Sequence, residues 1–224
     1  KYNPVESTRY GMGKFHGQFR LEGSLDNEEY VADISRFIIE LSQIDVTKLY
    51  PQTRIDYNIL YSFLEKIKFL MKDMRPWEWD PMWVLDEISH GLFLLSERRE
   101  MDMDERVEAI RKRLMKIPDL LNRSKEDMIS HSQLHIQYGN ERIDDIVFHL
   151  QQLPLKLSSD NLTLDEIDGY IEMTNQALMN YKKWLNQEST RLEELNYPVD
   201  LHLIFKAFPY FIGEKYLPDR VYKQ

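Results

Sequence analysis

The chain has 224 residues and a mass of 27.0 kDa, and 42% of its residues are apolar, which is enough to build a sizeable core and argues against disorder. Its 38 acidic and 29 basic residues give a net charge of −9, which disfavours binding to nucleic acid or to anionic membranes. The absence of cysteine excludes disulfides, thiolate catalysis and cysteine-ligated metal sites.

The first third of the sequence predicts two amphipathic helices. One is expected over about 27–44, and the second is expected to begin at Pro51 and to end near Met74. In both, apolar residues recur at three- and four-residue steps and predict a buried face. These residues are Tyr30, Ile34, Phe37, Ile38, Leu41 and Ile44 in the first helix, and Ile55, Ile59, Leu60, Phe63, Leu64, Ile67, Leu70 and Met71 in the second.

A proline-bounded connector, residues 75–81, interrupts this pattern and precedes a third helix. Asp80 is expected to cap that helix, which continues to about Glu97 with a buried stripe of its own. Trp77, Trp79 and Trp83 fall within seven residues and are candidates for a binding or docking surface. We favour the simpler interpretation that the three rings lock this corner against neighbouring helices.

Three further helices are predicted downstream of the connector. One begins at Asp102 or Asp104 and is expected to end at Pro118, because proline lacks the backbone donor that a helix interior needs. Another, over about 125–153, is expected to be opened by Ser124 with Asp127 and closed by Pro154. A capping box of Thr163 with Glu166 opens the last long helix, over about 163–193.

The tail, residues 199–224, is the most aromatic part of the chain and is expected to form a short helix or an extended segment. Its candidates for a docking surface are Phe205, Phe208, Tyr210, Phe211 and Tyr216. No segment shows sustained alternation of period two, and no run approaches the roughly 20 apolar residues of a membrane span. The sequence therefore predicts one all-α domain over 1–224, an array or bundle of seven to eight helices without a substantial sheet and without a membrane span.

Few residues suggest chemistry. His131 and His135 are four residues apart within a predicted helix, which would place both imidazoles on one face, as a zinc-binding pair requires. Ser132 stands where the H-E-x-x-H motif has its glutamate, and no third ligand is evident, so we favour an exposed histidine pair over a metal site. Hydrolase, kinase and dehydrogenase signatures are absent, and no catalytic or cofactor-binding residue is predicted.

The order of several short motifs resembles a bacterial family, the domain-of-unknown-function 885 family. The motifs are Asn3-Pro4 followed by Tyr10-Gly11, Ile44-Asp45, Arg54-Ile55-Asp56-Tyr57, Trp77-Glu78-Trp79-Asp80-Pro81, Leu114-Met115-Lys116-Ile117-Pro118, Trp184-Leu185 and Phe211-Ile212-Gly213-Glu214-Lys215-Tyr216. Each motif is short, but together they span nearly the whole chain.

This resemblance implies a long, mostly helical protein, often exported or lipid-anchored, whose carboxyl-terminal half is similar to zinc metallopeptidases and carries an H-E-x-x-H helix. That half is absent from this sequence, so no catalytic residue carries over and zinc is expected only there. The resemblance further implies an extracytoplasmic location, periplasmic or lipid-anchored. The expected partner is the protein's own carboxyl-terminal domain or another protein; the oligomeric state is not predicted.

Two functions are consistent with the sequence. In the first, the helices are the amino-terminal scaffold of a metallopeptidase-like hydrolase, form one wall of its substrate cleft, and expose an apolar patch where the other half docks. In the second, the chain is a complete, non-catalytic binding module of the cell envelope, and the terminal aromatic residues pack inward. A metal enzyme using His131 and His135 is a distant third.

Overall fold

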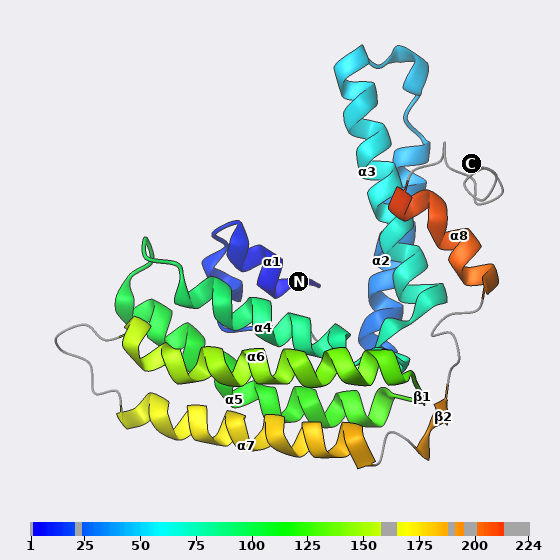
Figure 1. Cartoon of the computed structure of the whole chain (residues 1–224). Coiled ribbons are helices and arrows are strands. Elements are labelled where there is room, and N and C mark those ends of the chain that lie inside the picture. Colours follow the sequence, from blue (N-terminus) through cyan, green and yellow to red (C-terminus); the bar gives the residue numbers. More distant parts are fainter. Residues whose placement is uncertain (1, 21–23, 158–164, 188–190, 195–200, 213–224) are drawn as a thin grey trace. The chain divides into compact units, whose positions relative to one another are not determined.

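The computed structural model describes residues 2–20, 24–157, 165–187, 191–194 and 201–212. Within these residues the chain forms eight α-helices and one two-residue strand pair, which confirms the predicted all-α fold without a substantial sheet (Figure 1). The chain divides into two compact units, Lys1–Glu22 with Trp77–Asn196 (unit 1), and Gly23–Pro76 with Tyr197–Gln224 (unit 2). Two such units can belong to one domain, so the single-domain interpretation stays a prediction.

Unit 1 is a helical bundle in which α4, α5, α6 and α7 lie side by side, with α1 against α4. A 3₁₀ turn follows α1, and another lies in the connector before α4. The elements are α1 (Pro4–Arg9), the 3₁₀ turns Gly13–Phe15 and Pro76–Glu78, α4 (Met82–Ser96), α5 (Met103–Asp127), β1 (Ser130–His131), α6 (Gln133–Leu157), α7 (Asp165–Gln187) and β2 (Glu193–Glu194). The two strands pair in parallel, Ser130 with Glu193.

Helix α4 is at the centre of unit 1, since α1, α5 and α6 all contact it. Its apolar side chains are correspondingly 0–1% exposed; they are Val84, Leu85, Ile88, Leu92 and Leu95. Burial of each such side chain stabilises the fold by about 1.5–3 kcal/mol. The predicted stripe is therefore confirmed at Leu85, Ile88, Leu92 and Leu95, while Met82, also predicted in it, is half-buried. Asp80 accepts a hydrogen bond from the Met82 N–H (2.9 Å) at the start of the helix.

The predicted end of a helix at Pro118 is wrong, because α5 continues through this residue to Asp127. Proline at position 118 cannot donate to the carbonyl of Leu114, four residues earlier. The hydroxyl of Thr174, a fully buried residue of α7, donates to that carbonyl instead (3.3 Å). A side chain from a neighbouring helix thus supplies the donor that the proline removes.

The predicted helix over 125–153 is wrong at both ends. Residues 125–127 complete α5, and Met128 is extended, after which β1 and then α6 follow. The Ser124 hydroxyl is not a helix cap, since it is hydrogen-bonded to the Tyr181 hydroxyl (2.8 Å) inside the bundle. Pro154 lies within the last turn of α6, where it removes one hydrogen bond without ending the helix.

Unit 2 consists of a helical hairpin, α2 (Ser24–Ser42) and α3 (Pro51–Phe69), with α8 (Leu201–Ile212) against α3. A 3₁₀ turn, Val46–Lys48, joins the hairpin helices, and a π-helical turn, Leu70–Met74, extends α3. The sequence predicted either a short helix or an extended segment for the tail, and its described part, Leu201–Ile212, is a helix. The capping box at Thr163, the end of the tail after Ile212 and residues 199–200 lie outside the described residues, and α7 ends at Gln187 rather than near residue 193.

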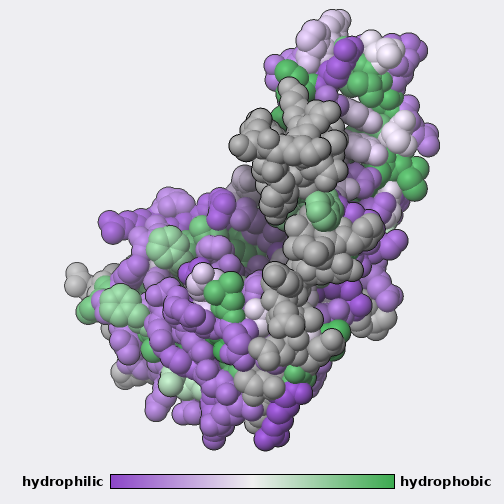
Figure 2. All heavy atoms as spheres, turned by 45° about the vertical axis from the view of Figure 1, so that its right-hand side comes forward, coloured by the Kyte–Doolittle hydropathy of each residue, from purple (hydrophilic) through white to green (hydrophobic). Residues whose placement is uncertain are grey.

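The broad buried faces predicted for α2 and α3 are wrong in part. Ile34 and Ile38 are buried, but other predicted core residues of these helices are exposed: Phe37, Ile44, Ile55, Ile59, Leu60 and Phe63 are 42–64% exposed. The physical reason is a lack of partners, because within unit 2 each hairpin helix has one long neighbour, while α4 in unit 1 has several. Figure 2 shows hydrophobic residues toward the end of the hairpin and more isolated ones on the visible face of unit 1.

Candidate binding pocket

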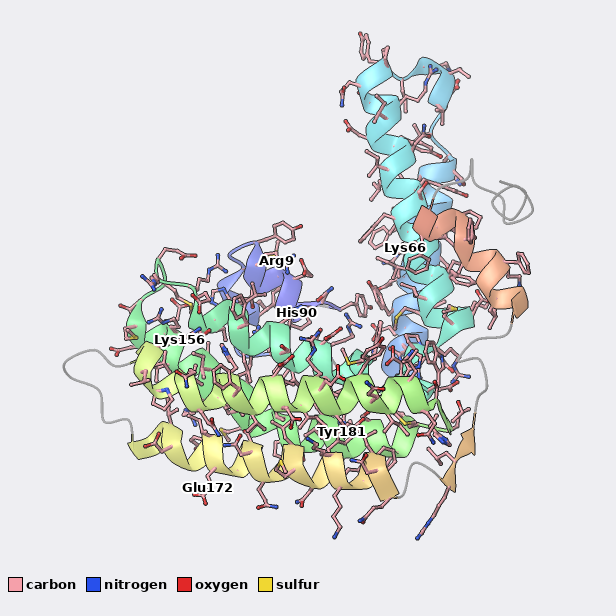
Figure 3. All side chains as sticks on the ribbon, viewed as in Figure 1. Arg9, Lys66, His90, Lys156, Glu172 and Tyr181 are labelled. Atoms are coloured by element: carbon pink, nitrogen blue, oxygen red, sulfur yellow. The ribbon has the colours of Figure 1, made fainter. Side chains whose placement is uncertain are left out.

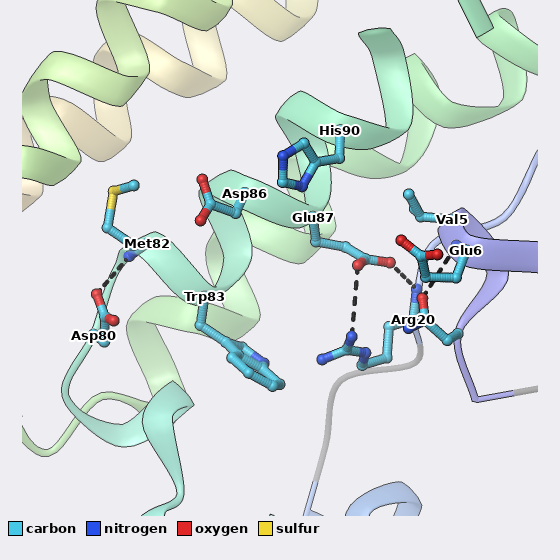
Figure 4. A pocket seen from close by; sticks show the side chains of 10 residues that line it. Val5, Glu6, Arg20, Asp80, Met82, Trp83, Asp86, Glu87 and His90 are labelled. Atoms are coloured by element: carbon cyan, nitrogen blue, oxygen red, sulfur yellow. Dashed lines mark hydrogen bonds and ion pairs between the residues drawn. The ribbon is translucent and has the colours of Figure 1, made fainter. Parts of the chain in front are cut away.

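A pocket of about 260 Å³ opens on unit 1 where α1, the segment at Arg20 and the start of α4 meet (Figure 4). Its lining is polar, with four carboxylates, one guanidinium, one imidazole and one indole. The lining residues are Asn3, Val5, Glu6, Arg20, Asp80, Met82, Trp83, Asp86, Glu87 and His90. All of them belong to unit 1.

Helical spacing arranges the α4 side of this pocket. Trp83, Glu87 and His90 are three or four residues apart and therefore share one face of the helix. Asp80 precedes the helix and is fixed by its bond with the Met82 N–H. On the opposite side, α1 is capped by Asn3, whose Oδ1 accepts from the Glu6 N–H (3.2 Å), which places Glu6 at the pocket.

Arg20 lies inside the pocket between an aromatic ring and a carboxylate. Its guanidinium carbon is 4.6 Å from the centroid of the Trp83 ring, within the range of a cation–π interaction. One guanidinium nitrogen is 3.8 Å from Glu87 Oε2, and the Arg20 backbone N–H donates to Glu87 Oε1 (3.0 Å). The chain's own arginine thus shows which chemical group this ring and this carboxylate hold.

The other carboxylates of the lining are those of Glu6, Asp80 and Asp86, and Glu6 is paired with Arg9 (3.3 Å), which is outside the lining. Asp86 is paired with Arg142, which is outside the lining (3.0 Å). Burial raises the pKa of Asp80, and the nearby Asp86 charge raises it further, against the opposing effects of the Met82 N–H bond and His135. A cation placed beside Asp80 would stabilise its charged form.

The three connector tryptophans have different surroundings. Trp77 is buried and its ring centroid is 6.3 Å from that of Trp83, while Trp79 meets the His135 ring edge-on at 5.1 Å. Of the three, Trp83 lines the pocket. This arrangement agrees with packing for Trp77 and Trp79, and gives Trp83 a second role at the pocket.

The structure does not place His131 and His135 on one helical face. His131 belongs to β1 and is 2% exposed, whereas His135 is in the first turn of α6, because the backbone between the two long helices is extended. The exposed histidine pair is therefore also wrong. Within the described part of the chain, no three histidine, aspartate or glutamate side chains gather as metal ligands.

The aromatic residues of α8 are partly covered. Phe205 and Phe211 are 46% and 54% exposed and Phe208 is half-buried, while Tyr216 lies outside the described residues. The Tyr210 ring stacks on Phe69 of α3 at a centroid distance of 5.3 Å. These residues and the tryptophan connector belong to different units.

Sequence reasoning missed most of the pocket. The Trp83, Glu87 and His90 spacing within a predicted helix was a usable signal for one wall. No local pattern connects Arg20 to Glu87, because 67 residues separate them and only the packing of the segment after α1 on α4 brings them together.

No family model and no curated protein matches the chain. A solved structure described as "a putative lipoprotein of unknown function from Shewanella oneidensis" has a similar fold, with a TM-score of 0.76 and 14% sequence identity over 93% of this chain. At this identity the likeness shows the fold alone. The chain spans 39% of that protein's length. None of the helices in the described residues is long and apolar enough to cross a membrane.

Proposed function

We propose that this chain is a non-catalytic helical domain that binds a basic polypeptide side chain in the Trp83 pocket. The domain forms one wall of the substrate cleft of a longer, zinc-peptidase-like hydrolase of the cell envelope. The observation that carries the binding role is the position of Arg20 between the Trp83 ring and Glu87. Glu6, Asp80 and Asp86 offer further carboxylates of the same lining to a ligand guanidinium or ammonium.

The pocket suits a side chain rather than a large ligand. A volume of about 260 Å³ is below the 300–1,000 Å³ usual for small-molecule sites. Arg20 already lies against the Trp83 ring, so charge-assisted hydrogen bonds to carboxylates are the strongest interactions that the lining leaves for a ligand, and they favour Arg over neutral residues. The pocket therefore selects a basic residue of a polypeptide whose backbone remains outside.

The remainder of the proposal rests on similarity. The resemblance to the domain-of-unknown-function 885 family implies a zinc-binding carboxyl-terminal half, and the similar fold from Shewanella oneidensis is in a protein of which this chain spans 39%. The description of that protein as a lipoprotein supports a cell-envelope location. Zinc belongs to the proposed second half and not to the pocket.

Peptide binding tests the pocket directly. A peptide with one central Arg should bind, and the same peptide with Gln should bind at least several-fold more weakly. Asp80→Asn, which keeps an acceptor for the Met82 N–H, should weaken binding of the Arg peptide by about ten-fold, since one charge-assisted contact is worth ~1.5 kcal/mol. Isothermal titration calorimetry measures both effects.

The matched control is Glu172→Gln, an exposed carboxylate that points away from the bundle on α7 (Figure 3). It changes the net charge by the same amount and should leave the affinity unchanged. Equal losses in both variants would show non-specific attraction to the acidic surface. No preference for Arg over Gln would reject the pocket as the site.

The mass of the protein from its native source tests the longer protein. A mass near or above twice 27.0 kDa, with peptides that extend beyond Gln224 into an H-E-x-x-H segment, is the expected result. A mass near 27.0 kDa would favour the second candidate, a complete binding module. The stacking of Tyr210 on Phe69, which turns part of the tail inward, is the observation in favour of that alternative.

A further inference from the structure

An apolar stripe runs along one face of α3. Ile55, Ile59 and Phe63 follow at four-residue steps and are 51%, 64% and 55% exposed. Side chains four residues apart lie one above another on a helix, so the three form a continuous surface about 12 Å long. We call these three residues the α3 stripe.

Helix α8 covers the continuation of this surface toward the end of α3. Lys66, one step beyond Phe63, has its Nζ 4.1 Å from the centroid of the Phe211 ring, and Phe69 stacks on Tyr210. Phe211 is next to the last residue of α8. The chain therefore leaves α8 at the level of α3 where the uncovered stripe begins (Figures 1 and 3).

We propose that the α3 stripe is the docking site of this chain's own residues 213–224, a segment outside the described residues. Its sequence, GEKYLPDRVYKQ, supplies four apolar or aromatic side chains, Tyr216, Leu217, Val221 and Tyr222. The site continues the established α3–α8 contact, and it does not depend on the proposed peptide pocket.

Residues 213–224 are long enough to reach every residue of the α3 stripe. From Lys66 to Ile55 along α3 is about 16 Å at 1.5 Å per residue. Twelve residues in an extended conformation span up to about 40 Å. Pro218 opposes a helix through the middle of the segment, so an extended strap along the stripe is the expected form.

A second copy of the chain fits the stripe less well. Three half-exposed side chains offer on the order of 100 Å² each, whereas a stable interface buries about 800 Å² per partner. A segment of the same chain needs far less buried area for stable docking, because its effective concentration at the neighbouring surface reaches the millimolar range. The small area therefore favours an occupant in the same chain.

The absence of cysteine from the sequence makes the test simple, because each introduced thiol is unique. Ile59→Cys is compared with Ile39→Cys on α2, since the two residues are 64% and 59% exposed. In the full chain, alkylation at position 59 should be several-fold slower than at position 39. Adding Tyr216→Ser and Leu217→Ser should abolish that difference and leave the rate at position 39 unchanged.

A double variant, Ile59→Cys with Leu217→Cys, should form an intrachain disulfide under mild oxidation, seen as a monomer that has lost two hydrogens and has no free thiols. Equal alkylation rates at positions 59 and 39 in the full chain would overturn the proposal. Protection that persists after the tail substitutions would assign the stripe to another occupant, and predominant disulfide-linked dimers would assign it to a second copy. Circular dichroism confirms that every variant retains the helical fold.

Discussion

Arg113 shows how one buried charge can join three elements of unit 1. It is 0% exposed, its Nη2 donates to the Thr8 hydroxyl (2.7 Å), and its Nη1 donates to the Gly91 carbonyl. Its guanidinium carbon is also 5.4 Å from the centroid of the Phe19 ring. Burial lowers the pKa of Arg113 to about 10, which still leaves it charged at neutral pH. The charged form of Arg113 is thus stabilised by two hydrogen bonds and by the Phe19 ring rather than by a close ion pair.

We expect Arg113→Lys to reduce the free energy of unfolding by about 2 kcal/mol. Lysine keeps the charge but has no planar fork, so it cannot reach both acceptors, and a buried acceptor loses its donor. Urea denaturation measures the change. The exposed residue Arg99 provides the control, since Arg99→Lys should be neutral; a neutral result at Arg113 would show that the fork is not needed.

Two histidines, the buried His16 and the half-buried His149, should make unit 1 sensitive to acid. Burial lowers the pKa of His16, and the charges of Arg98 and Arg113 lower it further, against the opposing effect of Glu105. Burial also lowers the pKa of His149; there Lys156 acts in the same direction and Glu97 opposes. As the pH falls through 6.5 the unfolded chain binds protons before the folded chain does, so stability decreases.

The measurement is the urea midpoint at several pH values between 8 and 5. The midpoint should fall as the pH falls below 7, and His16→Gln should flatten that slope because glutamine does not titrate. His90→Gln is the control, since His90 is exposed, and should leave the slope unchanged. A midpoint independent of pH in the unsubstituted chain would contradict the argument.

At the scale of the element, the continuity of α5 through Pro118 depends on Thr174. Thr174→Val should lower the free energy of unfolding by about 1–2 kcal/mol, because it leaves the buried Leu114 carbonyl without a donor. In a Pro118→Ala background the cost should be smaller, since Ala restores the backbone N–H at position 118.

A double-mutant cycle over Thr174 and Pro118 tests this coupling. Purely additive effects would show that the hydroxyl does not replace the missing donor. The swap of Thr for Val keeps the side-chain shape, so loss of packing cannot account for the coupling.

Sequence patterns predicted the elements whose surroundings are simple. The stripe of α4 was correct at Leu85, Ile88, Leu92 and Leu95, because neighbours cover this helix on several sides, whereas Phe93 on another face is 50% exposed. The same pattern wrongly predicted that Ile55, Ile59 and Phe63 are buried, because periodicity shows which face of a helix is apolar but not whether another element covers that face. The predicted helix end at Pro118 was wrong for a related reason. The donor that replaces its missing N–H is the hydroxyl of Thr174, 56 residues later in the sequence. Trp83 was predicted as a candidate, whereas Arg20 depended on tertiary packing.

At the scale of the whole molecule, the two units differ in how deeply their helices are buried. Among the described residues of α3 only Phe69 is fully buried, whereas α4 has eight buried positions. Hydrogen exchange should therefore be faster for α2 and α3 amides than for α4 and α5 amides, because local opening costs less where fewer apolar contacts break. Mass spectrometry of exchanging peptides measures the difference; uniform protection would show that the chain opens as one cooperative body.

The units are also interleaved along the chain, since each consists of two separate segments. During synthesis the α2–α3 hairpin is made early, but its partner α8 emerges only after the whole of unit 1. At roughly 5–20 residues per second the delay between Pro76 and Leu201 is on the order of ten seconds. For that time the apolar side chains of the hairpin that α8 later covers, such as Phe69, lack their native neighbour, and the order of translation makes this hairpin the part of the chain most in need of chaperone protection.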